Sequence, residues 1–538
     1  MNATRTDSPA SLPDAATRIE LGLFASRVAA LCEEMGALLG RTAFSPNIRD
    51  RLDYSCAAFD ASGALLGQAT HIPVHLGSMA HAMGPLAESR RWRRGDLLAV
   101  NDPFQGGTHL PDITLISPAF VDGTLVGFCA NRAHHADIGA EAPGSMPVST
   151  RLEQEGVLIP PTLVGDRDGW RRDVLDGLLA QLRDGEAALG DFSAQAAANR
   201  LGVQRLEALA AQAADAFRPR VDALQAYGER LARDTLAGLP AGVFTFEDWL
   251  DDDGAGTSPI RIVVTLEVDG RGGVRVGFDG TAPQVPGNLN CPFPVTVAAV
   301  TYVFRCLMPD QVPACAGAFR PLEITAPAGC LVNARPPAAV AAGNVETSMR
   351  IVDAVCGALA KALPGRLPAA SQGTMNNLAL GRLGAGGWDY YETLAGGMGA
   401  GPDHPGNCAR HSHMTNTLNT PVEVLERHTP LRIERYAVRR GSGGAGRLRG
   451  GDGVERVYRF LADASLSVIA ERRLHAPWGL EGGAAGAPGR CLLDDEELPP
   501  KCERSVRAGQ RLRVLTPGGG GHGDPATAGP PSDGADHS

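Results

Sequence analysis

The pattern of apolar and polar positions first indicates a β-hairpin about one fifth of the way along the chain. Two apolar runs, at 113–120 and 125–131, flank a glycine-containing turn, which is typical of a buried hairpin. One polar cluster, with His109 and Asp112, precedes the first run, and another, at 134–137, follows the second. Because a hairpin returns its second strand beside its first, we expect the two clusters to meet in space.

Helical periodicity dominates two other parts of the first half. Apolar residues at spacings of four and three predict an amphipathic helix from residue 17 to about residue 40. A region rich in Ala, Leu, Gln and Arg, 172–238, predicts further helices with breaks near Gly190 and Pro219. Asp191 then suits the N-cap position of the helix that follows it. The periodic apolar residues of this helix indicate core packing or a subunit contact.

Strand and helix patterns alternate in the second half. Alternation over 260–278 predicts a hairpin, and helices are expected over 295–307 and 344–363. From Gly396 the chain is dense in glycine, with short β-like runs over 431–515. We interpret its glycine-rich loops as tight turns whose positive φ angles glycine tolerates at little cost.

Composition and charge narrow the classes of partner. Apolar residues make up 43% of the chain, as in soluble globular proteins. Fifty basic against 60 acidic residues give a net charge of −10 without basic runs, which argues against nucleic acid and anionic membranes. No apolar run reaches the ~18 residues of a membrane span, and the N-terminus lacks a signal-peptide core, so we expect a cytoplasmic protein. The 11 cysteines form no Cys-x-x-Cys pair, which argues against a zinc finger or a disulfide framework.

The two clusters beside the hairpin contain residue types that bind divalent metals. A single His-x-x-Asp is more often an ordinary loop, but two clusters around one hairpin favour a metal site. We assign His109, Asp112 and His134 as ligands, a set that suits Zn, Mn or Fe about equally well. Asp137 is either a further ligand or the carboxylate that fixes an imidazole tautomer. His135 and Asp137 are also candidate catalytic residues.

Two carboxylates outside these clusters are further candidates. Asp53 precedes a strand-like run at 54–59 that would carry it inward, which makes it a candidate fourth ligand. The alternative for Asp53 is a solvated ion pair with neighbouring arginines. Glu155 stands in a turn-rich segment that could close over the site, so we include it as a candidate catalytic residue. The alternative for Glu155 is a solvated loop glutamate.

Four other histidines have open roles. His71 and His75 are separated by Pro73, which opposes a helix through both, so we expect them to line a pocket or to be structural rather than to bind metal. His411 and His413 could join the pocket from another domain or satisfy buried backbone groups in a loop.

Nucleotide-binding and serine-hydrolase motifs are not evident in the sequence. Gly441–Gly446 matches the pattern G-x-G-x-x-G, but a strand-like run follows it and offers no helix N-terminus for a pyrophosphate. The sequence has no Gly-x4-Gly-Lys-Ser/Thr loop, so we expect no ATP site, and it has no Gly-x-Ser-x-Gly elbow. A divalent metal can lower the pKa of water to roughly 7 or polarise a carbonyl, which suits attack on an amide, a lactam or a ketone.

These patterns predict an α+β protein. We expect a multidomain mixed α/β chain with a central metal-bearing β-hairpin, a long helical insert and a Gly-rich β C-terminal part. At 538 residues, the chain exceeds the size of one ordinary core. The expected parts are a disordered tail at 1–16, a metal-site α+β domain at 17–240, a mixed α/β domain at 241–395, a Gly-rich mostly β region at 396–523 and a disordered tail at 524–538.

Motifs over nearly the whole chain resemble the hydantoinase B/oxoprolinase family. That family includes the B-type component of ATP-dependent N-methylhydantoinases, the matching half of 5-oxoprolinase and the equivalent subunits of acetone and acetophenone carboxylases. The motifs that carry the resemblance occur in this order: RLDYSCAAFD, HIPVHLGSM, GDLLAVNDPFQGGTHLPDITLISP, HHADIG, EGVLIPP, FSAQAAANRLG, DGTAPQVPGNLN, AAGNVETS, HMTNTLNTPVEVLE, RRGSGGAGRLRGGDGVER and TPGGGGHG.

The resemblance implies a division of labour between two subunits. In such systems an A-type, actin-like ATPase subunit uses ATP to phosphorylate the substrate carbonyl, and the B-type subunit completes the reaction with a metal-bound nucleophile. The family ligands carry over onto His109, Asp112 and His134, and Asp53 is a further carry-over. Leu418 stands where the family pattern has arginine, which affects substrate detail.

The resemblance therefore implies a metal-dependent catalytic B-type subunit of an ATP-dependent cyclic-amide hydrolase that acts on hydantoins, oxoproline or lactams. We expect a hetero-oligomer in which the partner, not this chain, uses ATP. The alternatives are a subunit of an ATP-dependent ketone carboxylase and a non-catalytic scaffold subunit.

Overall fold

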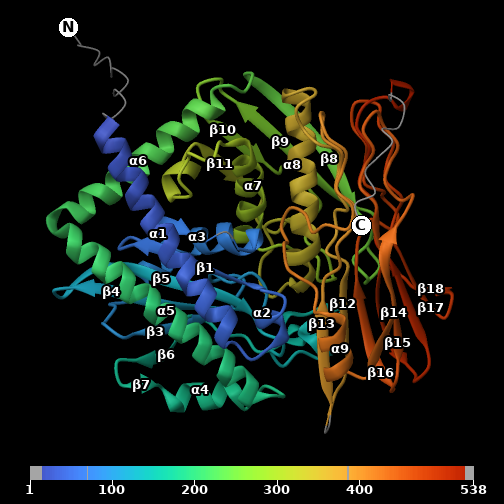
Figure 1. Ribbon diagram of the computed structural model, residues 1–538, viewed down its shortest axis with the longest axis horizontal. Coiled ribbons are helices and arrows are strands. Elements are labelled where there is room, and N and C mark those ends of the chain that lie inside the picture. The colour runs from blue at the N-terminus through green and yellow to red at the C-terminus, as the bar shows by residue number, and fades with distance from the viewer. Residues whose placement is uncertain (1–14, 70, 385–386, 528–538) are drawn as a thin grey trace.

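The computed structural model describes residues 15–69, 71–384 and 387–527 (Figure 1). Of the two expected disordered tails, 1–14 and 528–538 lie outside the described residues. Within the described part, helix α1 begins at Ala15 and a short 3-10 turn ends at Thr527. Among the described residues, none of the helices combines the length and apolarity that crossing a lipid bilayer requires.

A seven-stranded antiparallel sheet, in the order β2-β1-β5-β4-β3-β6-β7, contains the predicted hairpin near its centre. Its strands are β1 (Tyr54–Asp60), β2 (Leu65–Gln68), β3 (Leu97–Val100), β4 (Asp112–Val121), β5 (Thr124–His134), β6 (Thr162–Asp166) and β7 (Gly169–Trp170). Side chains alternate between its faces. Cys56 and Ala58 pack in the cluster that contains α1 (Ala15–Thr42), whereas Ala57 and Phe59 pack with α3 (Pro73–Glu88).

The helical region consists of α4 (Arg172–Leu179), α5 (Gly185–Ala213) and α6 (Phe217–Leu236), with α5 lying across the first sheet (Figure 1). The predicted break near Gly190 is wrong, because this residue lies inside α5. The predicted break near Pro219 is confirmed, because α5 ends at Ala213 and α6 begins at Phe217, two residues before the proline. A Cβ at Gly190 would lie 2.5 Å from the Phe44 ring, so packing explains this glycine. Asp191 is not an N-cap. Its carboxylate is buried and accepts hydrogen bonds from the Phe44 and Ser45 amides at 2.7 and 3.0 Å.

A second, four-stranded sheet has the order β11-β10-β9-β8 and packs on two helices. Its strands are β8 (Gly242–Leu250), β9 (Ile260–Val268), β10 (Val274–Gly277) and β11 (Leu322–Thr325), and the helices are α7 (Phe293–Leu307) and α8 (Ser348–Ala362). A single π-helical turn, Gly343–Thr347, leads into α8. Helix α3 also packs on α7. The two helices lie so close that a Cβ at Gly77 would lie 2.5 Å from the Cα of Ala298.

Two further sheets share one core at the C-terminal end, at the right of Figure 1. One is β13-β12-β16-β19 and the other is β14-β15-β20-β17-β18. Their elements are β12 (Asn377–Arg382), β13 (Trp388–Glu392), α9 (Val422–His428), β14 (Leu431–Arg439), β15 (Gly453–Phe460), β16 (Ala464–Ile469), β17 (Arg490–Leu493), β18 (Glu496–Glu497), β19 (Lys501–Val506) and β20 (Arg511–Leu515). Because β12 pairs with β16, this sheet crosses the expected boundary at 395/396.

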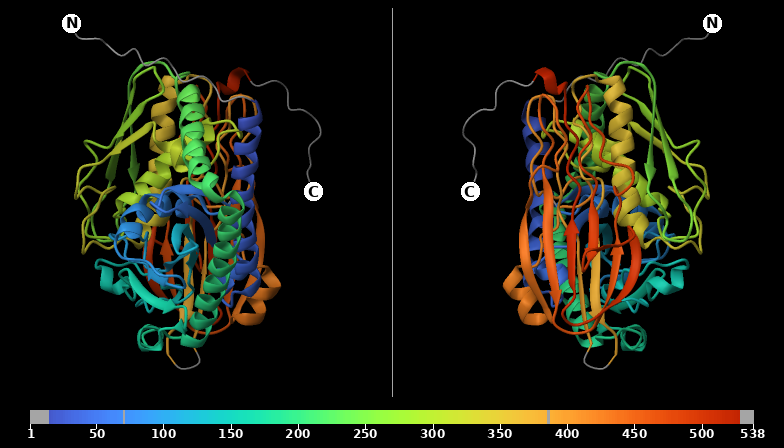
Figure 2. Two further views of the ribbon diagram at one scale, coloured as in Figure 1. Left: turned by 90° about the vertical axis from the view of Figure 1, so that its left-hand side faces the viewer. Right: turned by 90° about the vertical axis from the view of Figure 1, so that its right-hand side faces the viewer.

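The interpretation of the glycine-rich segments as tight turns holds at Gly441, which lies in a turn with φ +85°, but not along most of their length. They run as extended chain without strand geometry and hydrogen-bond to several neighbours (Figure 2). Gly451 donates to the Met398 carbonyl at 2.9 Å, and Gly519 donates to the Gly451 carbonyl at 2.9 Å. A Cβ at Gly519 would lie 2.0 Å from the Met398 oxygen, and a Cβ at Gly451 would lie 2.0 Å from the Asn407 oxygen. Close backbone approach, not positive φ, therefore requires glycine at these positions.

Candidate metal centre

The β4–β5 register brings three of the predicted ligands together. Asp112 opens β4 and pairs directly with His134, which ends β5. Oδ1 of Asp112 lies 3.2 Å from Nε2 of His109 and 3.3 Å from Nδ1 of His134. One ligand atom from each residue lies within 4.8 Å of the others, and all three residues are buried. The two polar clusters therefore meet, as expected, at His109, Asp112 and His134.

The chemistry of this triad fits a divalent cation. Oδ1 of Asp112 and Nε2 of both His109 and His134 are buried and have no hydrogen-bond partner among the described residues. Unpaired buried polar atoms are costly, at about 1–3 kcal/mol each. A cation coordinated between two imidazoles and a carboxylate would satisfy such atoms, and this donor set suits Zn, Mn or Fe.

The surroundings of Asp112 keep its carboxylate ionised. Thr108 Oγ1 donates to its Oδ2 at 2.6 Å, and Nε2 of His75 lies 3.2 Å from the same oxygen. Burial alone would raise the pKa of Asp112, but His109 and His75 outweigh it and hold the pKa well below its usual range. An ionised carboxylate is the form that binds a metal.

Glu155 supports the site from behind His109. Its Oε1 accepts hydrogen bonds from Ser149 Oγ and from the amides of Val340 and Ala341 at 2.7, 2.9 and 3.0 Å. The Ala341 carbonyl lies 3.3 Å from Nδ1 of His109 and can fix the orientation of its ring. Burial raises the pKa of Glu155 to about 7. Glu155 is thus linked to His109 only indirectly, through the backbone of Ala341.

Sequence reasoning missed the residues that hold His134. The Tyr391 ring stacks on the imidazole with centroids 5.0 Å apart and an interplanar angle of 13°. Tyr391 donates its hydroxyl proton to Asn377 Oδ1 at 2.8 Å, and Asn377 Nδ2 donates to Glu346 Oε1 at 2.6 Å. These residues come from distant strands and a helix entry. No local pattern in the sequence links them to His134.

Asp53 and His75 line the same cavity as the triad. Nε2 of His75 lies 3.9 Å from Asp53 Oδ1, and Asp53 Oδ2 lies 3.9 Å from a guanidinium nitrogen of Arg51. As predicted from Pro73, no helix runs through both histidines, because α3 begins at Pro73. Nδ1 of His71 accepts a hydrogen bond from the Cys56 amide at 3.2 Å instead.

His135 and Asp137 lie apart from the triad. Neighbouring side chains of an extended chain point to opposite sides, so His135 turns away from the side that His134 occupies. Its Nε2 lies 3.0 Å from Gln195 Oε1. Asp137 accepts hydrogen bonds from the Gly139 amide and from the Arg183 guanidinium at 2.8 and 3.2 Å. Both candidates line a different cavity of about 870 Å³, and the structure does not bring them to the metal centre.

His411 and His413 are not among the residues that line this cavity. Burial lowers the pKa of His411 to about 4, with Arg51 acting in the same direction. Nε2 of His413 lies 3.8 Å from Asp353 Oδ1. Met414, Thr415 and the following residues of this segment reach the cavity instead.

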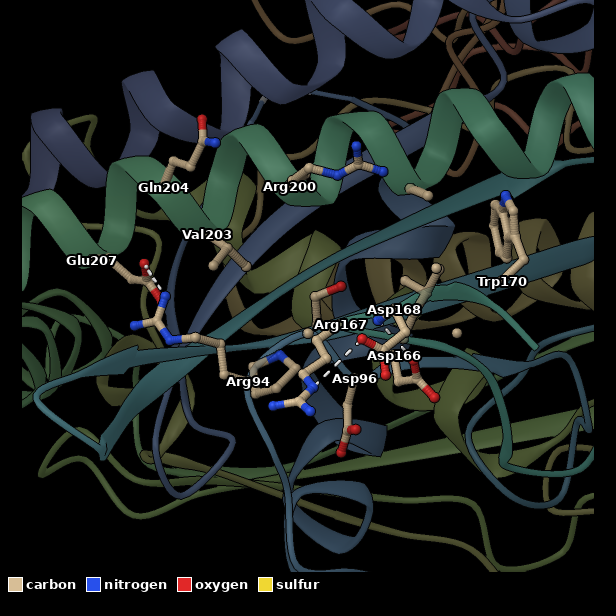
Figure 3. A pocket seen from close by; sticks show the side chains of 17 residues that line it. Arg94, Asp96, Asp166, Arg167, Asp168, Trp170, Arg200, Val203, Gln204 and Glu207 are labelled. Atoms are coloured by element: carbon tan, nitrogen blue, oxygen red, sulfur yellow. Dashed lines mark hydrogen bonds and ion pairs between the residues drawn. The ribbon is translucent and has the colours of Figure 1, made fainter.

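The cavity around the triad is small. Its volume of about 20 Å³ can hold roughly one ion or one water molecule. It is lined by Asp53, Ile72, Val74, His75, His109, Asp112, His134, Asn344, Val345, Met375, Tyr391, Thr393, Met414, Thr415 and Thr417. A larger pocket of about 560 Å³ lies elsewhere, between α5 and the β3–β6–β7 edge (Figure 3). Its Arg94 pairs with Glu207, and its Arg167 pairs with Asp168.

Comparison with known proteins identifies relatives along nearly the full chain. An uncharacterized protein of Methanocaldococcus jannaschii is 39% identical over 94% of this chain and 91% of its own length. 5-Oxoprolinase 1 of Arabidopsis thaliana is 37% identical, and the B-type component of a putative D-/L-hydantoinase from a Pseudomonas species is 33% identical. The alignments cover 94% and 91% of this chain, respectively. They cover 42% of the plant protein and 87% of the Pseudomonas protein.

Solved structures share the fold. The ATP-dependent caprolactamase of Pseudomonas jessenii superposes with a TM-score of 0.87 at 27% identity, covering 96% of this chain and 93% of that chain. Nucleotide-free acetone carboxylase superposes with a TM-score of 0.86 at 19% identity, covering 96% and 76%. The model of the family described as hydantoinase B/oxoprolinase matches residues 17–525, and the chain therefore belongs to this family.

Proposed function

We propose that the chain is the metal-dependent catalytic B-type subunit of an ATP-dependent cyclic-amide hydrolase. The observation that carries this proposal is the buried triad of His109, Asp112 and His134, with its unpartnered ligand atoms. Family membership and the likeness to an ATP-dependent caprolactamase support a cyclic amide such as a hydantoin, oxoproline or a lactam as substrate.

The chain's own residues would prepare the site for attack on a carbonyl. His109, Asp112 and His134 would hold the cation, which would supply Lewis acidity for activating water or a carbonyl at neutral pH. His75 and Thr108 hold the Asp112 carboxylate from its Oδ2 side. Burial of the ligands excludes bulk water, which strengthens electrostatic interactions inside the site.

The proposal includes a partner that activates the substrate. The sequence offers no phosphate-binding loop, and one relative is named as the B-type component of a hydantoinase. The chain spans about two fifths of the length of the 5-oxoprolinases that it matches, for example 42% of the plant protein. We infer an A-type ATPase partner that phosphorylates the substrate carbonyl, so that ATP is used by the partner in a hetero-oligomer.

Metal analysis of the purified protein tests the site directly. We expect His109→Ala and Asp112→Asn to lower the bound metal about tenfold or more, because the first removes one of three ligands and the second replaces the anionic ligand with a neutral one. His404→Ala is the matched control, since the His404 side chain is 65% exposed and lies outside the cavity. Equal metal content in wild type, His109→Ala and Asp112→Asn would refute the triad as a metal site.

Activity is tested with the partner subunit co-purified. ATP hydrolysis should rise with hydantoins or lactams, and formation of the ring-opened product should be lost in Asp112→Asn while the complex still assembles. Bicarbonate-dependent turnover of a ketone would favour a carboxylase instead. Full activity of the Asp112→Asn complex would favour a scaffold role.

A further inference from the structure

Three threonine hydroxyls line the metal-centre cavity together with the ligands. Thr393 follows β13, and Thr415 and Thr417 lie in the segment before α9. All three residues are at most 4% exposed. Met375 and Val345 also line this cavity, so the threonines are polar groups in a wall that is partly apolar.

Arg51 fixes one end of a hydroxyl chain. Its Nη2 donates to Thr393 Oγ1 at 3.1 Å, and its Nη1 donates to the Tyr391 carbonyl at 3.1 Å. Thr393 Oγ1 lies 2.9 Å from Thr417 Oγ1, which lies 3.4 Å from Thr415 Oγ1. Arg51 is fully buried, so bulk water does not screen its charge.

A count of the hydroxyl protons shows that one of the three threonine hydroxyls has no acceptor for its proton. Three hydroxyls carry three protons, and the two contacts between them use two. Arg51 cannot accept the third, because a guanidinium has donors only. Among the described residues, no other hydrogen-bond acceptor contacts these hydroxyls. Whichever threonine keeps the third proton, that threonine is one of the residues that line the cavity.

We propose that Thr393, Thr415 and Thr417 form a donor wall that binds one anionic oxygen of the substrate beside the metal triad, and that the cavity, which has room for about one ion or water in this structure, widens to admit the rest of the group. The wall suits a phosphoryl or carboxylate oxygen, because hydrogen bonds to charged acceptors are roughly twice as strong as neutral ones. A hydrogen bond from the same donor to a neutral amide oxygen is weaker. This inference rests on the proposed function only in placing the reacting group in this cavity.

Binding of small anions to the full chain tests the wall. Inorganic phosphate, acetate and neutral ε-caprolactam are titrated calorimetrically with and without Mn²⁺, and Mn²⁺ affinity is measured separately. Thr417→Val should weaken phosphate binding about tenfold or more, as expected for a lost hydrogen bond to a charged acceptor. Thr417→Ser should restore it to within about twofold. Mn²⁺ affinity should be unchanged in both variants.

Thr420→Val is the matched control, because Thr420 is buried in the same segment but does not line the cavity. Thr415→Val gives a second comparison if Thr417→Val does not fold. A stronger response to phosphate than to acetate identifies a phosphoryl group as the ligand, and the reverse identifies a carboxylate. Absence of phosphate and acetate binding by the wild-type protein, or equal affinities in wild type and both valine variants, would overturn the donor wall. Failure to bind Mn²⁺ would refute the metal proposal alone, since the Mn²⁺-free titration still compares the variants.

Discussion

At the scale of single residues, burial sets the charge state of Glu346. Its Oε1 accepts hydrogen bonds from the Met375 amide and Asn377 Nδ2, whereas its Oε2 has no partner among the described residues. Burial, followed by repulsion from Glu471, raises the pKa of Glu346 to about 8. The folded protein therefore holds this proton at pH values where the unfolded chain has lost it.

This raised pKa predicts a pH-dependent stability. Between the ordinary value of 4.5 and about 8, the folded state binds the extra proton, so the free energy of unfolding should fall as pH rises. The fall should be about 1.4 kcal/mol for each unit of pKa displacement. Urea unfolding from pH 5 to pH 8 should show a shallower decline in Glu346→Gln. Part of the decline should remain, because Glu155 titrates in the same direction. Equal declines in wild type and variant would contradict the assignment.

The candidate site was predictable where its residues are close in sequence to one hairpin. His109, Asp112 and His134 meet because strand pairing converts their positions into proximity. His134 was assigned as a ligand from the sequence, whereas His135, a candidate catalytic residue, lies beside Gln195 and away from the triad. Tyr391 and Thr417 could not be found, because they lie far from His134 in the sequence and only the tertiary fold brings them to the cavity.

At the scale of elements, apolar periodicity predicts some helices and strands but not the glycine-rich segments. The hairpin of β4 and β5 and the helices α1, α7 and α8 follow local apolar spacing and were predicted. Apart from the turn at Gly441, the glycine segments were misread, because their composition resembles that of turns. What selects glycine there is the distance to a neighbouring backbone, which only the folded chain defines.

Two glycine substitutions should have opposite effects. Gly519→Ala should lower the free energy of unfolding by about 2 kcal/mol or more, because its Cβ would lie 2.0 Å from the Met398 oxygen and force the segments apart. Gly177→Ala should raise it by about 0.5–1 kcal/mol, since Gly177 lies in α4 with nothing within 4 Å of an added Cβ. Chemical denaturation of both variants provides the comparison. A neutral Gly519→Ala would argue against close packing of these segments.

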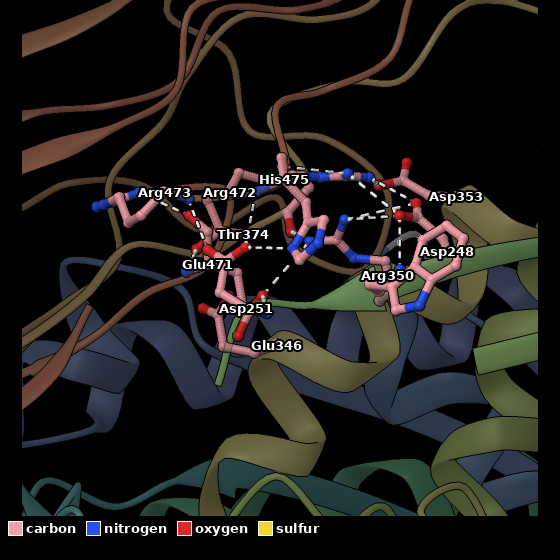
Figure 4. A network of polar contacts seen from close by, with 12 residues as sticks. Asp248, Asp251, Glu346, Arg350, Asp353, Thr374, Glu471, Arg472, Arg473 and His475 are labelled. Atoms are coloured by element: carbon pink, nitrogen blue, oxygen red, sulfur yellow. Dashed lines mark hydrogen bonds and ion pairs between the residues drawn. The ribbon is translucent and has the colours of Figure 1, made fainter. Parts of the chain in front are cut away.

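At the scale of the whole molecule, a buried ion-pair network joins the second sheet to the C-terminal sheets (Figure 4). Arg472 follows β16 and donates to Asp248 on β8 at 2.9 Å and to Asp353 on α8 at 2.5 Å. Arg350, also on α8, contacts Asp248 at 3.4 Å. Four buried charges from β8, α8 and the segment after β16 thus meet in one place.

Removing one member of this network should destabilise the whole chain. Arg472→Met should lower the free energy of unfolding by about 3–5 kcal/mol, because two buried carboxylates lose their main cation. Arg490→Met, at the exposed pair with Glu497, should have little effect on unfolding and serves as the control. Thermal and urea unfolding measure both. Similar stabilities for the two variants would show that the network does not hold the layers together.

The tight enclosure of the triad has a consequence for how an ion would come and go. His109, Asp112 and His134 are each at most 3% exposed, and the space between them holds about one ion. A chelator in solution cannot touch an ion seated there until the surrounding wall parts. The rate at which a chelator removes the ion should therefore be set by that opening and should not increase with chelator concentration.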